Sequence, residues 1–460
     1  MTKVLTQALG ALVTEIGTSR PPEDALDVVR LGFIDAFGVM IAGAGEEAVR
    51  ILHDAIAPAR GPSTLYPDGT RIAAPEAAFI NGMAAHVLDY DDVALRGHPS
   101  AALVPAILAE AEALGADGAS MMRAYLAGYE VWADLVHRDP DQHHEKGWHP
   151  TGIFGAVAAA AACSVLRGLT PDVTATALAL GASHSSGIMS NFGSMAKPMH
   201  AGLAARAGVV AARLAAGGFS ASLDALEHPQ GFLAAISPGG RVDLDSPPRD
   251  VGMWRILDHR LSIKKYPICY CAHRATDAIL DLRSSHDLPV DAIAAISVST
   301  SRRCSKLLRN SQPQTGLEAK FSMQFAIAAG LISGRVGLSE LSDNFVLRAD
   351  VQELMQKVTI IPDDRQDPLN GYAPEDVVIV ETVAGVRIEG AAVTTPRGSA
   401  TLPLDRHELL EKFTACIGSG LPEADAMSLF AMLESLDRAP GIQSLLDAFS
   451  PVPNKKTGAK

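Results

Sequence analysis

Alanine-rich runs with apolar residues at helical spacing dominate the first half of the chain, and they restrict its fold more than any other feature. Glycine and proline lie mostly between these runs, which cover residues 26–41, 101–114, 153–166 and 201–214. Apolar residues that recur every three or four positions form one face of a helix, and such faces pack against one another. We therefore predict a large all-helical domain over residues 1–250.

The pattern changes after about residue 245. β-branched residues now gather in short runs with Pro, Asp or Gly nearby, at residues 293–300, 358–361 and 377–380. Such runs are typical of strands, and the break at Ala384-Gly385 within residues 377–393 indicates a hairpin. This part of the chain is therefore predicted to contain a sheet.

Helical windows recur between these strands, near residues 321–331 and 349–356. Strands mixed with helices predict a smaller, compact α+β domain over residues 251–402. Residues 403–460 return to the helical pattern, at 407–416, 423–436 and 442–449. These C-terminal helices could pack back onto the first domain, which would make it discontinuous, and the fold class is mainly α.

The charge balance excludes several kinds of partner. Lysine and arginine number 39 against 52 aspartates and glutamates, for a formal net charge of -13. This charge repels phosphate backbones and anionic membrane surfaces, and no segment is apolar enough to span a bilayer. With five cysteines and no secretory signal at the start, we expect a soluble cytoplasmic protein that binds neither nucleic acid nor membrane.

Familiar cofactor and metal motifs are missing. Cys269 and Cys271 form a C-x-C pair, but no second motif stands at ligand spacing. Residues 152–155 read Gly-Ile-Phe-Gly, which is no dinucleotide-binding turn, and phosphate-loop and serine-elbow motifs are also absent from the sequence. We therefore expect neither cofactor nor metal, and catalysis by ordinary side chains.

A titratable or cationic residue precedes proline at three junctions that open apolar helices, namely His98-Pro99, His149-Pro150 and Lys197-Pro198. Proline suits the first helical position, so each side chain is predicted at a helix N-terminus, where free N–H groups attract anions. Chance gives roughly one or two such dipeptides, and His228-Pro229 is a fourth. Three such ends could converge on a carboxylate.

A second candidate is the acidic run after His86, which contains Asp89, Asp91 and Asp92. On a helix His86 and Asp89 share a face, so Asp89 could orient a histidine for acid-base work. A solvated acidic helix end is the plainer alternative. A divalent metal on the three aspartates is conceivable, but the run lacks the glycine and distal glutamate of a calcium loop.

A third candidate runs from Lys264 to Asp277, near the predicted domain junction. It sets Lys264, Lys265 and His273 beside aromatic residues, a combination that suits capture of an anionic small molecule. Surface charges beside buried aromatics explain the same residues equally well.

Together these segments resemble the MmgE/PrpD family, which includes 2-methylcitrate dehydratase, cis-aconitate decarboxylase and an iminodisuccinate epimerase. The ordered motifs that carry the resemblance are HVLDYDDVALRGHPS (86–100), WHPTG (148–152), KPMHAG (197–202), KKYPICYCAHRATD (264–277) and KFSMQF (320–325). The resemblance implies a helical domain built from N- and C-terminal segments, a smaller α+β lid domain, and a homodimer. It also implies a cofactor-independent pocket between the helical and lid domains. It also implies a set of pocket residues, namely Asp89, His98, His149, Lys197, Lys264 and His273.

Three positions depart from the decarboxylase-like members. Val93 stands where those have threonine, Cys269 where they have histidine, and Phe325 where they have tyrosine. Each change removes a polar group, which places decarboxylation last among the activities that the resemblance implies.

The leading hypothesis is a lyase that removes water from a small di- or tricarboxylate, such as a 2-methylcitrate-like acid. Lys197 and Lys264 would bind carboxylates, and His98 and His149 would act as acid and base in an order the sequence leaves open. Asp89 would fix the tautomer of one imidazole. An epimerase or isomerase of a dicarboxylate is the nearest alternative, then a decarboxylase, then a non-catalytic carboxylate binder.

Overall fold

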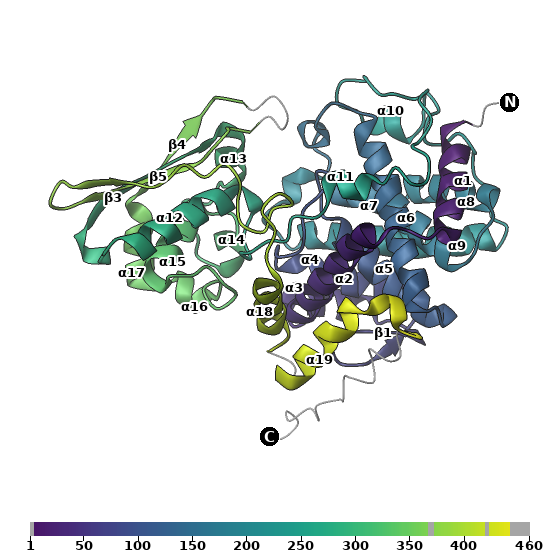
Figure 1. Ribbon diagram of the computed structural model, residues 1–460, viewed down its shortest axis with the longest axis horizontal. Helices are drawn as coiled ribbons and strands as arrows, with labels where there is room; N and C mark the ends of the chain where they lie inside the picture. The colour runs from purple at the N-terminus through teal and green to yellow at the C-terminus, as the bar shows by residue number, and fades with distance from the viewer. Residues whose placement is uncertain (1–3, 367–371, 419–422, 442–460) are drawn as a thin grey trace. The chain divides into compact units, whose positions relative to one another are not determined.

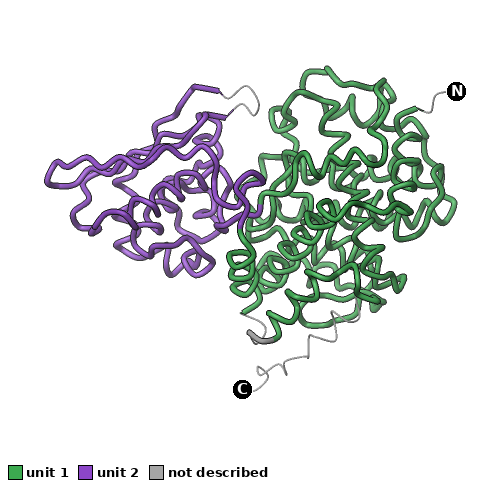
Figure 2. The backbone as a smooth tube through the Cα atoms, viewed as in Figure 1, with its two compact units in different colours: residues 1–262, 405–460 green, residues 263–404 purple. Residues whose placement is uncertain are grey.

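The computed structural model describes residues 4–366, 372–418 and 423–441. The chain divides into two compact units, shown in separate colours in Figure 2. Unit 1 combines residues 1–262 with residues 405–460, and unit 2 is residues 263–404. Each unit has its own layered core and is described separately below.

Unit 1 is a helical bundle (Figure 1). Its helices before the chain enters unit 2 are α1 (Leu5–Thr18), α2 (Glu23–Gly43), α3 (Glu47–Ile56), α4 (Ala74–Val87), α5 (Pro99–Leu114), α6 (Gly118–His137), η1 (His143–Lys146), α7 (Pro150–Leu166), α8 (Pro171–Ser183), η2 (Met189–Asn191), α9 (Ala196–Ala216), α10 (Phe232–Ile236) and α11 (Arg255–His259). The four alanine-rich runs lie within α2, α5, α7 and α9, which confirms the helices predicted from their spacing.

Small residues explain how these helices pack so closely. A Cβ atom added at Gly82 of α4 would lie 2.9 Å from the Cα of Gly202 in α9. A Cβ at Gly208 of α9 would lie 2.3 Å from the Cβ of Ala159 in α7. Because such approaches exclude larger side chains, the alanines and glycines bring α4, α7 and α9 into direct backbone contact. This packing sets one end of α4 beside the first turns of α5, α7 and α9.

The C-terminal segment returns to unit 1. Helices α18 (Arg406–Ile417) and α19 (Glu423–Glu434), followed by η5 (Leu436–Arg438), pack against α2, and Figure 1 draws them beside it. A capping box at Asp405 and Glu408 begins α18 by satisfying backbone N–H groups. The helices predicted at 407–416 and 423–436 are therefore confirmed, whereas the one predicted at 442–449 lies outside the described residues.

Unit 1 is not all-helical, which corrects one prediction. Strands β1 (Arg60–Thr64) and β2 (Arg71–Ile72) pair in an antiparallel hairpin between α3 and α4. Residues 59–73 lack apolar residues at helical spacing, and Pro67-Asp68-Gly69 between the strands is a turn signal. The prediction of an all-helical domain over residues 1–250 did not take this turn signal into account.

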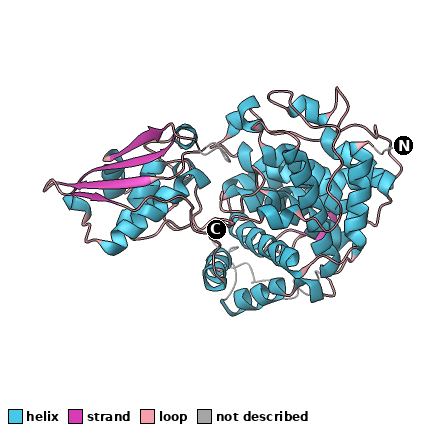
Figure 3. Ribbon diagram, turned by 45° about the horizontal axis from the view of Figure 1, so that its top comes forward, coloured by secondary structure: helices cyan, strands magenta, loops and turns pink. Residues whose placement is uncertain are grey.

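Unit 2 is a four-stranded sheet with helices (Figure 3). The strand order is β4-β3-β5-β6, with β3 and β4 parallel and the other pairs antiparallel. Its strands are β3 (Ile293–Ser301), β4 (Val358–Asp363), β5 (Val377–Thr382) and β6 (Arg387–Glu389). The three predicted strands and the predicted hairpin, formed by β5 and β6, are all present.

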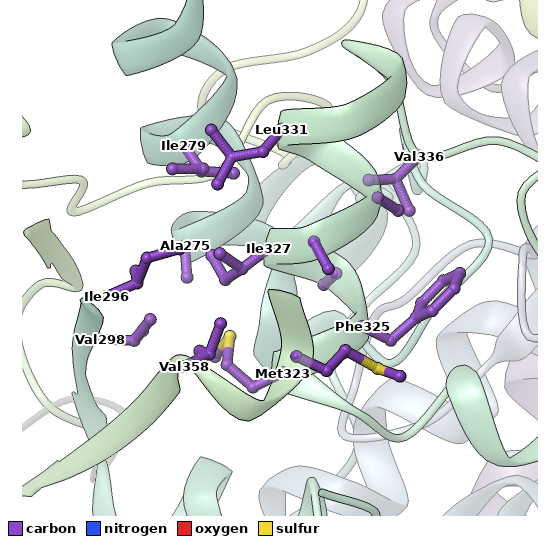
Figure 4. Close-up of a cluster of buried hydrophobic side chains, with 14 of the residues drawn as sticks. Ala275, Ile279, Ile296, Val298, Met323, Phe325, Ile327, Leu331, Val336 and Val358 are labelled. Carbon is purple, nitrogen blue, oxygen red and sulfur yellow. The ribbon is translucent and has the colours of Figure 1, made fainter. Parts of the chain in front are cut away.

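The helices of unit 2 are η3 (Tyr270–Ala272), α12 (His273–Ser285), η4 (Val290–Ala292), α13 (Arg302–Leu307), α14 (Gly316–Ala319), α15 (Met323–Ser333), α16 (Asp343–Val346) and α17 (Ala349–Gln356). Figure 4 shows how α12, α15 and the sheet share one apolar core. Ile279 of α12 and Ile327 of α15 belong to this core with Val298 of β3. The helical windows predicted near 321–331 and 349–356 correspond to α15 and α17.

The boundary of unit 1 lies after Ser262, later than the expected boundary at residue 250. The short helix α11 explains this difference. The backbone N–H groups of Arg255 and Ile256 donate to the Glu130 carboxylate of α6, at 3.1 and 2.9 Å. These bonds satisfy the first turn of α11 and hold it on unit 1. Within the described ranges, no helix is both long and apolar enough to cross a membrane.

Candidate active site

The loop between α4 and α5 has a constrained backbone. Asp89, Leu95 and Arg96 all have positive φ, at 53°, 51° and 65°. Residues other than glycine rarely adopt this conformation, and it persists only where surrounding contacts impose it. Arg96 supplies such contacts, since its Nη1 donates to the carbonyls of Asp139 at 3.2 Å and Asp141 at 2.5 Å.

The C-terminal segment holds the same loop from a second direction. Lys412 of α18 is buried, and its Nζ donates to the carbonyl of Tyr90 at 2.7 Å. The same Nζ lies 2.5 Å from Oδ1 of Asp35 on α2. Burial, opposed by the nearby Lys412, raises the pKa of Asp35. Burial also raises the pKa of Asp92 well above its usual range, with help from Asp35 and Asp91.

His98 stands at the N-cap of α5, directly before Pro99. Its Nδ1 lies 2.9 Å from the carbonyl oxygen of Asp92 and 3.1 Å from Oδ2 of Asp91. A carbonyl oxygen only accepts hydrogen bonds, so this Nδ1 carries a proton. A neutral His98 therefore has no proton on Nε2. A charged His98 carries a proton on Nε2, and this is the proton that it can transfer. Its backbone N–H donates to the Thr151 hydroxyl of α7 at 3.2 Å, which ties the two helix ends together.

Asp91 is shared between two imidazoles. Nδ1 of His86, at the end of α4, lies 2.9 and 3.0 Å from its two carboxylate oxygens. Burial would raise the pKa of Asp91, but attraction to His86 and His98 outweighs burial and holds that pKa well below its usual range. Burial lowers the pKa of His86 to about 4 against the pull of Asp91. Asp91 is therefore a buried carboxylate that accepts from a neutral His86.

His149 stands at the N-cap of α7, directly before Pro150, in a different setting. Its Nδ1 lies 3.1 Å from Nδ1 of His200 on α9, and its ring packs edge-on against Phe192 with centroids 4.8 Å apart. Burial lowers the pKa of His149 well below its usual range, and His86 and Lys197 lower it further. His149 is thus a buried histidine whose hydrogen-bonding neighbour is a second imidazole.

Lys197 binds Asp89 directly. Both side chains are buried, and the ammonium contacts Oδ1 of Asp89 in a short ion pair. The same ammonium lies over the ring of Phe192, 5.4 Å from its centroid. Lys197 therefore places a positive charge beside Asp89 and the aromatic face of Phe192, and its role in carboxylate binding stays a prediction.

The structure brings four of the six predicted residues into one cluster of unit 1. The rings of His86 and His98 lie 4.5 Å apart, and those of His86 and His149 lie 5.7 Å apart. Lys197 and Asp89 join this cluster through Phe192, which contacts both Lys197 and His149. The helix ends predicted to converge therefore do so within this unit.

One predicted detail is wrong. Lys197 is the second residue of α9 rather than the residue before it, because α9 begins at Ala196. Asp91, which was not among the predicted site residues, contacts the imidazoles of His86 and His98. Helix α4 ends at Val87, and the positive φ of Asp89 then turns the chain away from helical geometry. The role predicted for Asp89 stays a prediction. The His228-Pro229 dipeptide opens no helix and is exposed.

His86 and His200 were not among the predicted site residues, although both lie inside the quoted motifs. The spacing of His86 and Asp89 made His86 a candidate partner of the acidic run, whereas no spacing singled out His200. His200 meets His149 only through the packing of α9 on α7, and His86 meets Asp91 only through the turn that follows α4. One signal was available: each of these histidines is a titratable residue inside a motif that already contains a predicted site residue.

Lys264 and His273 belong to unit 2. Lys264 is almost fully buried. His273 is the first residue of α12, its Nε2 lies 3.3 Å from the carbonyl of Ile268, and its ring lies between those of Tyr266 and Tyr270. Their part in the site stays a prediction.

One group of side chains in the described ranges has the spacing of a metal site. His86, Asp91 and His98 each offer a ligand atom within 4.8 Å of the others, and these residue types bind Zn²⁺. Asp89 and Asp92 are outside this group, so the acidic run forms no single carboxylate cluster. The expectation of a metal-free site stays a prediction.

Comparisons with known proteins agree with the family resemblance that the ordered motifs indicate. The model of the MmgE/PrpD N-terminal domain matches residues 7–245, and that of the MmgE/PrpD C-terminal domain matches residues 266–438. The chain is 27% identical to cis-aconitate decarboxylase of Homo sapiens, over 95% of this chain and 92% of that protein. It is 26% identical to the Mus musculus enzyme of that name, over 95% and 91%. It is 24% identical to the one from Aspergillus terreus, over 94% and 93%. This chain belongs to the MmgE/PrpD family.

Proposed function

We propose that this protein is a lyase that removes water from a small di- or tricarboxylate by proton transfer between histidines and substrate. The observation that carries the proposal is the opposite surroundings of two histidines built in the same way. His98 and His149 each precede the proline that opens a helix, but one has a carboxylate partner and the other has an imidazole partner. Two titratable groups held in different environments are the usual basis for separate acid and base roles.

His149 suits the base. Its lowered pKa keeps it neutral near pH 7, because burial and the neighbouring His86 and Lys197 disfavour a charged ring. A neutral imidazole offers one lone pair, which can take the proton from the carbon next to a substrate carboxylate. The negative charge that develops there is of the sign that the nearby Lys197 ammonium stabilises.

His98 suits the acid. Its Nδ1 lies 3.1 Å from the charged Asp91 carboxylate, and the Asp92 carbonyl at 2.9 Å fixes a proton on Nδ1. In the imidazolium form of His98 the second proton is on Nε2, from which it can pass to a departing hydroxyl. Elimination then releases water and leaves a carbon-carbon double bond. The resting state returns when His149 releases its proton to solvent and His98 takes one up from solvent.

Decarboxylation is the second candidate, because the three relatives cited above are all named cis-aconitate decarboxylase. Loss of carbon dioxide needs a proton donor for the resulting carbanion but no base, so a matched acid and base favours dehydration. Val93 and Cys269 also depart from the threonine and histidine that the family resemblance implies for decarboxylase-like members. Phe325 does not support this argument, since it is fully buried in unit 2 and packs edge-on against Phe345, with centroids 6.3 Å apart.

The test is NMR of the purified protein in deuterated water with 2-methylcitrate, citrate, cis-aconitate and iminodisuccinate. Dehydration predicts deuterium at the carbon that loses its proton, together with an alkene product. Loss of carbon dioxide from cis-aconitate would identify the decarboxylase, and deuterium entry with only a change of configuration would identify an epimerase. No change in any of the four acids would reject the proposal for these substrates.

Separate His149→Ala and Lys197→Ala variants test the assignment to this cluster. The matched control is His228→Ala, since His228 also precedes a proline but is exposed and opens no helix. Activity that survives both cluster substitutions would contradict the proposed site. Lys264→Ala and His273→Ala test whether the remaining predicted residues take part.

A further inference from the structure

His149 and His200 share a geometry that couples their protonation. Their Nδ1 atoms are 3.1 Å apart, and the ring centroids are 5.3 Å apart. Two protonated Nδ1 atoms would clash at this distance, and two bare ones would repel. The pair is therefore stable when one proton lies between the two nitrogens.

The surrounding backbone fixes this geometry. The backbone N–H of His149 donates to the carbonyl of Gly187 at 3.0 Å. Gly187 has φ of 110°, and a Cβ atom there would lie 3.0 Å from Cγ of His200. Only glycine lets the chain pass so close over the His200 ring while it binds His149. The two imidazoles are therefore held by one segment, and neither turns freely away from the other.

The charged and titratable groups that act on the pair are His86, His98 and Lys197. These groups are cationic or become cationic on protonation, so they oppose a second positive charge on His149. Burial and Lys197 lower the pKa of His200 as well. At rest both rings are neutral and hold the single Nδ1 proton between them.

We propose that His200 is the proton partner of His149, so that the pair works as one two-ring base. This inference rests on the proposed function, in which His149 accepts the substrate proton. Nε2 of His149 takes that proton while the Nδ1 proton of His149 moves to Nδ1 of His200. One N–H bond forms and one breaks on His149, one N–H bond forms on His200, and the positive charge ends on His200. His200 touches no substrate atom in this scheme and is a positioning and proton-storing residue.

The first test needs no substrate. Nitrogen-15 NMR of the wild-type side chains is expected to find one protonated Nδ1 in the pair, and its signal should disappear in His200→Ala. The matched control is His184→Asn, an exposed histidine at the end of α8, which should leave that signal in place. Both histidines protonated only on Nε2 would overturn the proposal. On acidification, charge should appear on His200 while His149 changes tautomer, and the reverse order would also overturn it.

The second test separates proton storage from simple orientation. In His200→Asn the amide can occupy the Nδ1 position and keep the hydrogen bond, but it does not accept a proton near neutral pH. Proton storage predicts that His200→Asn and His200→Ala both lose roughly tenfold or more of the rate of deuterium exchange into substrate. A wild-type rate in His200→Asn with a loss only in His200→Ala would overturn proton storage. If the wild type exchanges no proton with the four acids, the proposed function fails, and the nitrogen-15 experiment alone decides the pair.

Discussion

His98 and His149 begin from the same local construction and end in opposite chemical settings. Each is the N-cap residue before the proline that opens a helix, α5 or α7. Asp91, a charged carboxylate, faces Nδ1 of His98, whereas the imidazole of His200 faces Nδ1 of His149. The helix end positions each ring, but the residue across from Nδ1 decides whether the ring favours holding or accepting a proton.

Removal of His149 should have the largest effect on activity. His149→Gln keeps a polar side chain but lacks a titratable ring, so turnover is expected to fall roughly 10³- to 10⁴-fold. Steady-state rates of the purified variant check this, with the exposed His228→Gln as the control. If His149→Gln lost less than about tenfold, His149 would not be the base, and the contrast between the two histidines would fail.

Asp91→Asn should make the two histidines more alike. The amide is neutral and no longer provides a charged acceptor for Nδ1 of His98, so we expect turnover to fall roughly 10²-fold. Steady-state rates of the purified variant check this. Asp92→Asn is the control, since Asp92 meets His98 through its backbone carbonyl. A wild-type rate in Asp91→Asn would contradict the role of His98.

Lys412→Met should disturb the loop that contacts His98 and leave the surroundings of His149 unchanged. Lys412 holds the loop of Asp89 to Asp92 through the carbonyl of Tyr90 and offsets the buried Asp35. Loss of one partner of a buried ion pair costs about 3–5 kcal/mol of unfolding free energy, and we expect activity to fall roughly tenfold. Denaturant unfolding checks the first value, with the ion pair between the exposed Arg406 of α18 and Glu434 of α19 as the control. Arg406→Met should change stability by less than about 1 kcal/mol.

The smallest effect concerns His86, which donates to the same carboxylate as His98. Its pKa of about 4 lies below the value of about 6.5 expected in the unfolded chain, so the unfolded state binds more protons between these values. Stability from a neutral His86 is therefore present above pH 6.5 and lost as pH falls toward 4. NMR titration of the His86 ring should find this low pKa and a still lower one in Asp91→Asn. A His86 that titrates near pH 6.5 would contradict the buried network.

Local features of this site were predictable from sequence, but the side chains that contact His98 and His149 were not. Proline directly after His98 and His149 fixed the helix starts, since both prolines occupy the first helical position. The contacts of Asp91 with His86 and His98 depend on the positive φ at Asp89, which the loop imposes through distant contacts. His200 reaches His149 only because glycine and alanine let α9 and α7 pack closely.

The same division holds for the fold. Helices with strong apolar spacing and strands rich in β-branched residues were predicted correctly, because each pattern shows which side chains of its own segment are buried. The β1–β2 hairpin was missed because its strands are short and mostly polar. The late boundary at Ser262 depends on Glu130, whose contact with α11 joins residues far apart in sequence.

The most direct test of the two roles is hydrogen exchange at the substrate carbon in His98→Gln and His149→Gln, measured by NMR in deuterated water with the acid that the wild type converts. A base without its acid partner still removes and returns the carbon-bound proton, so His98→Gln should incorporate deuterium while product formation stops. His149→Gln should do neither. Exchange that persists in His149→Gln and stops in His98→Gln would reverse the assignment and contradict this account.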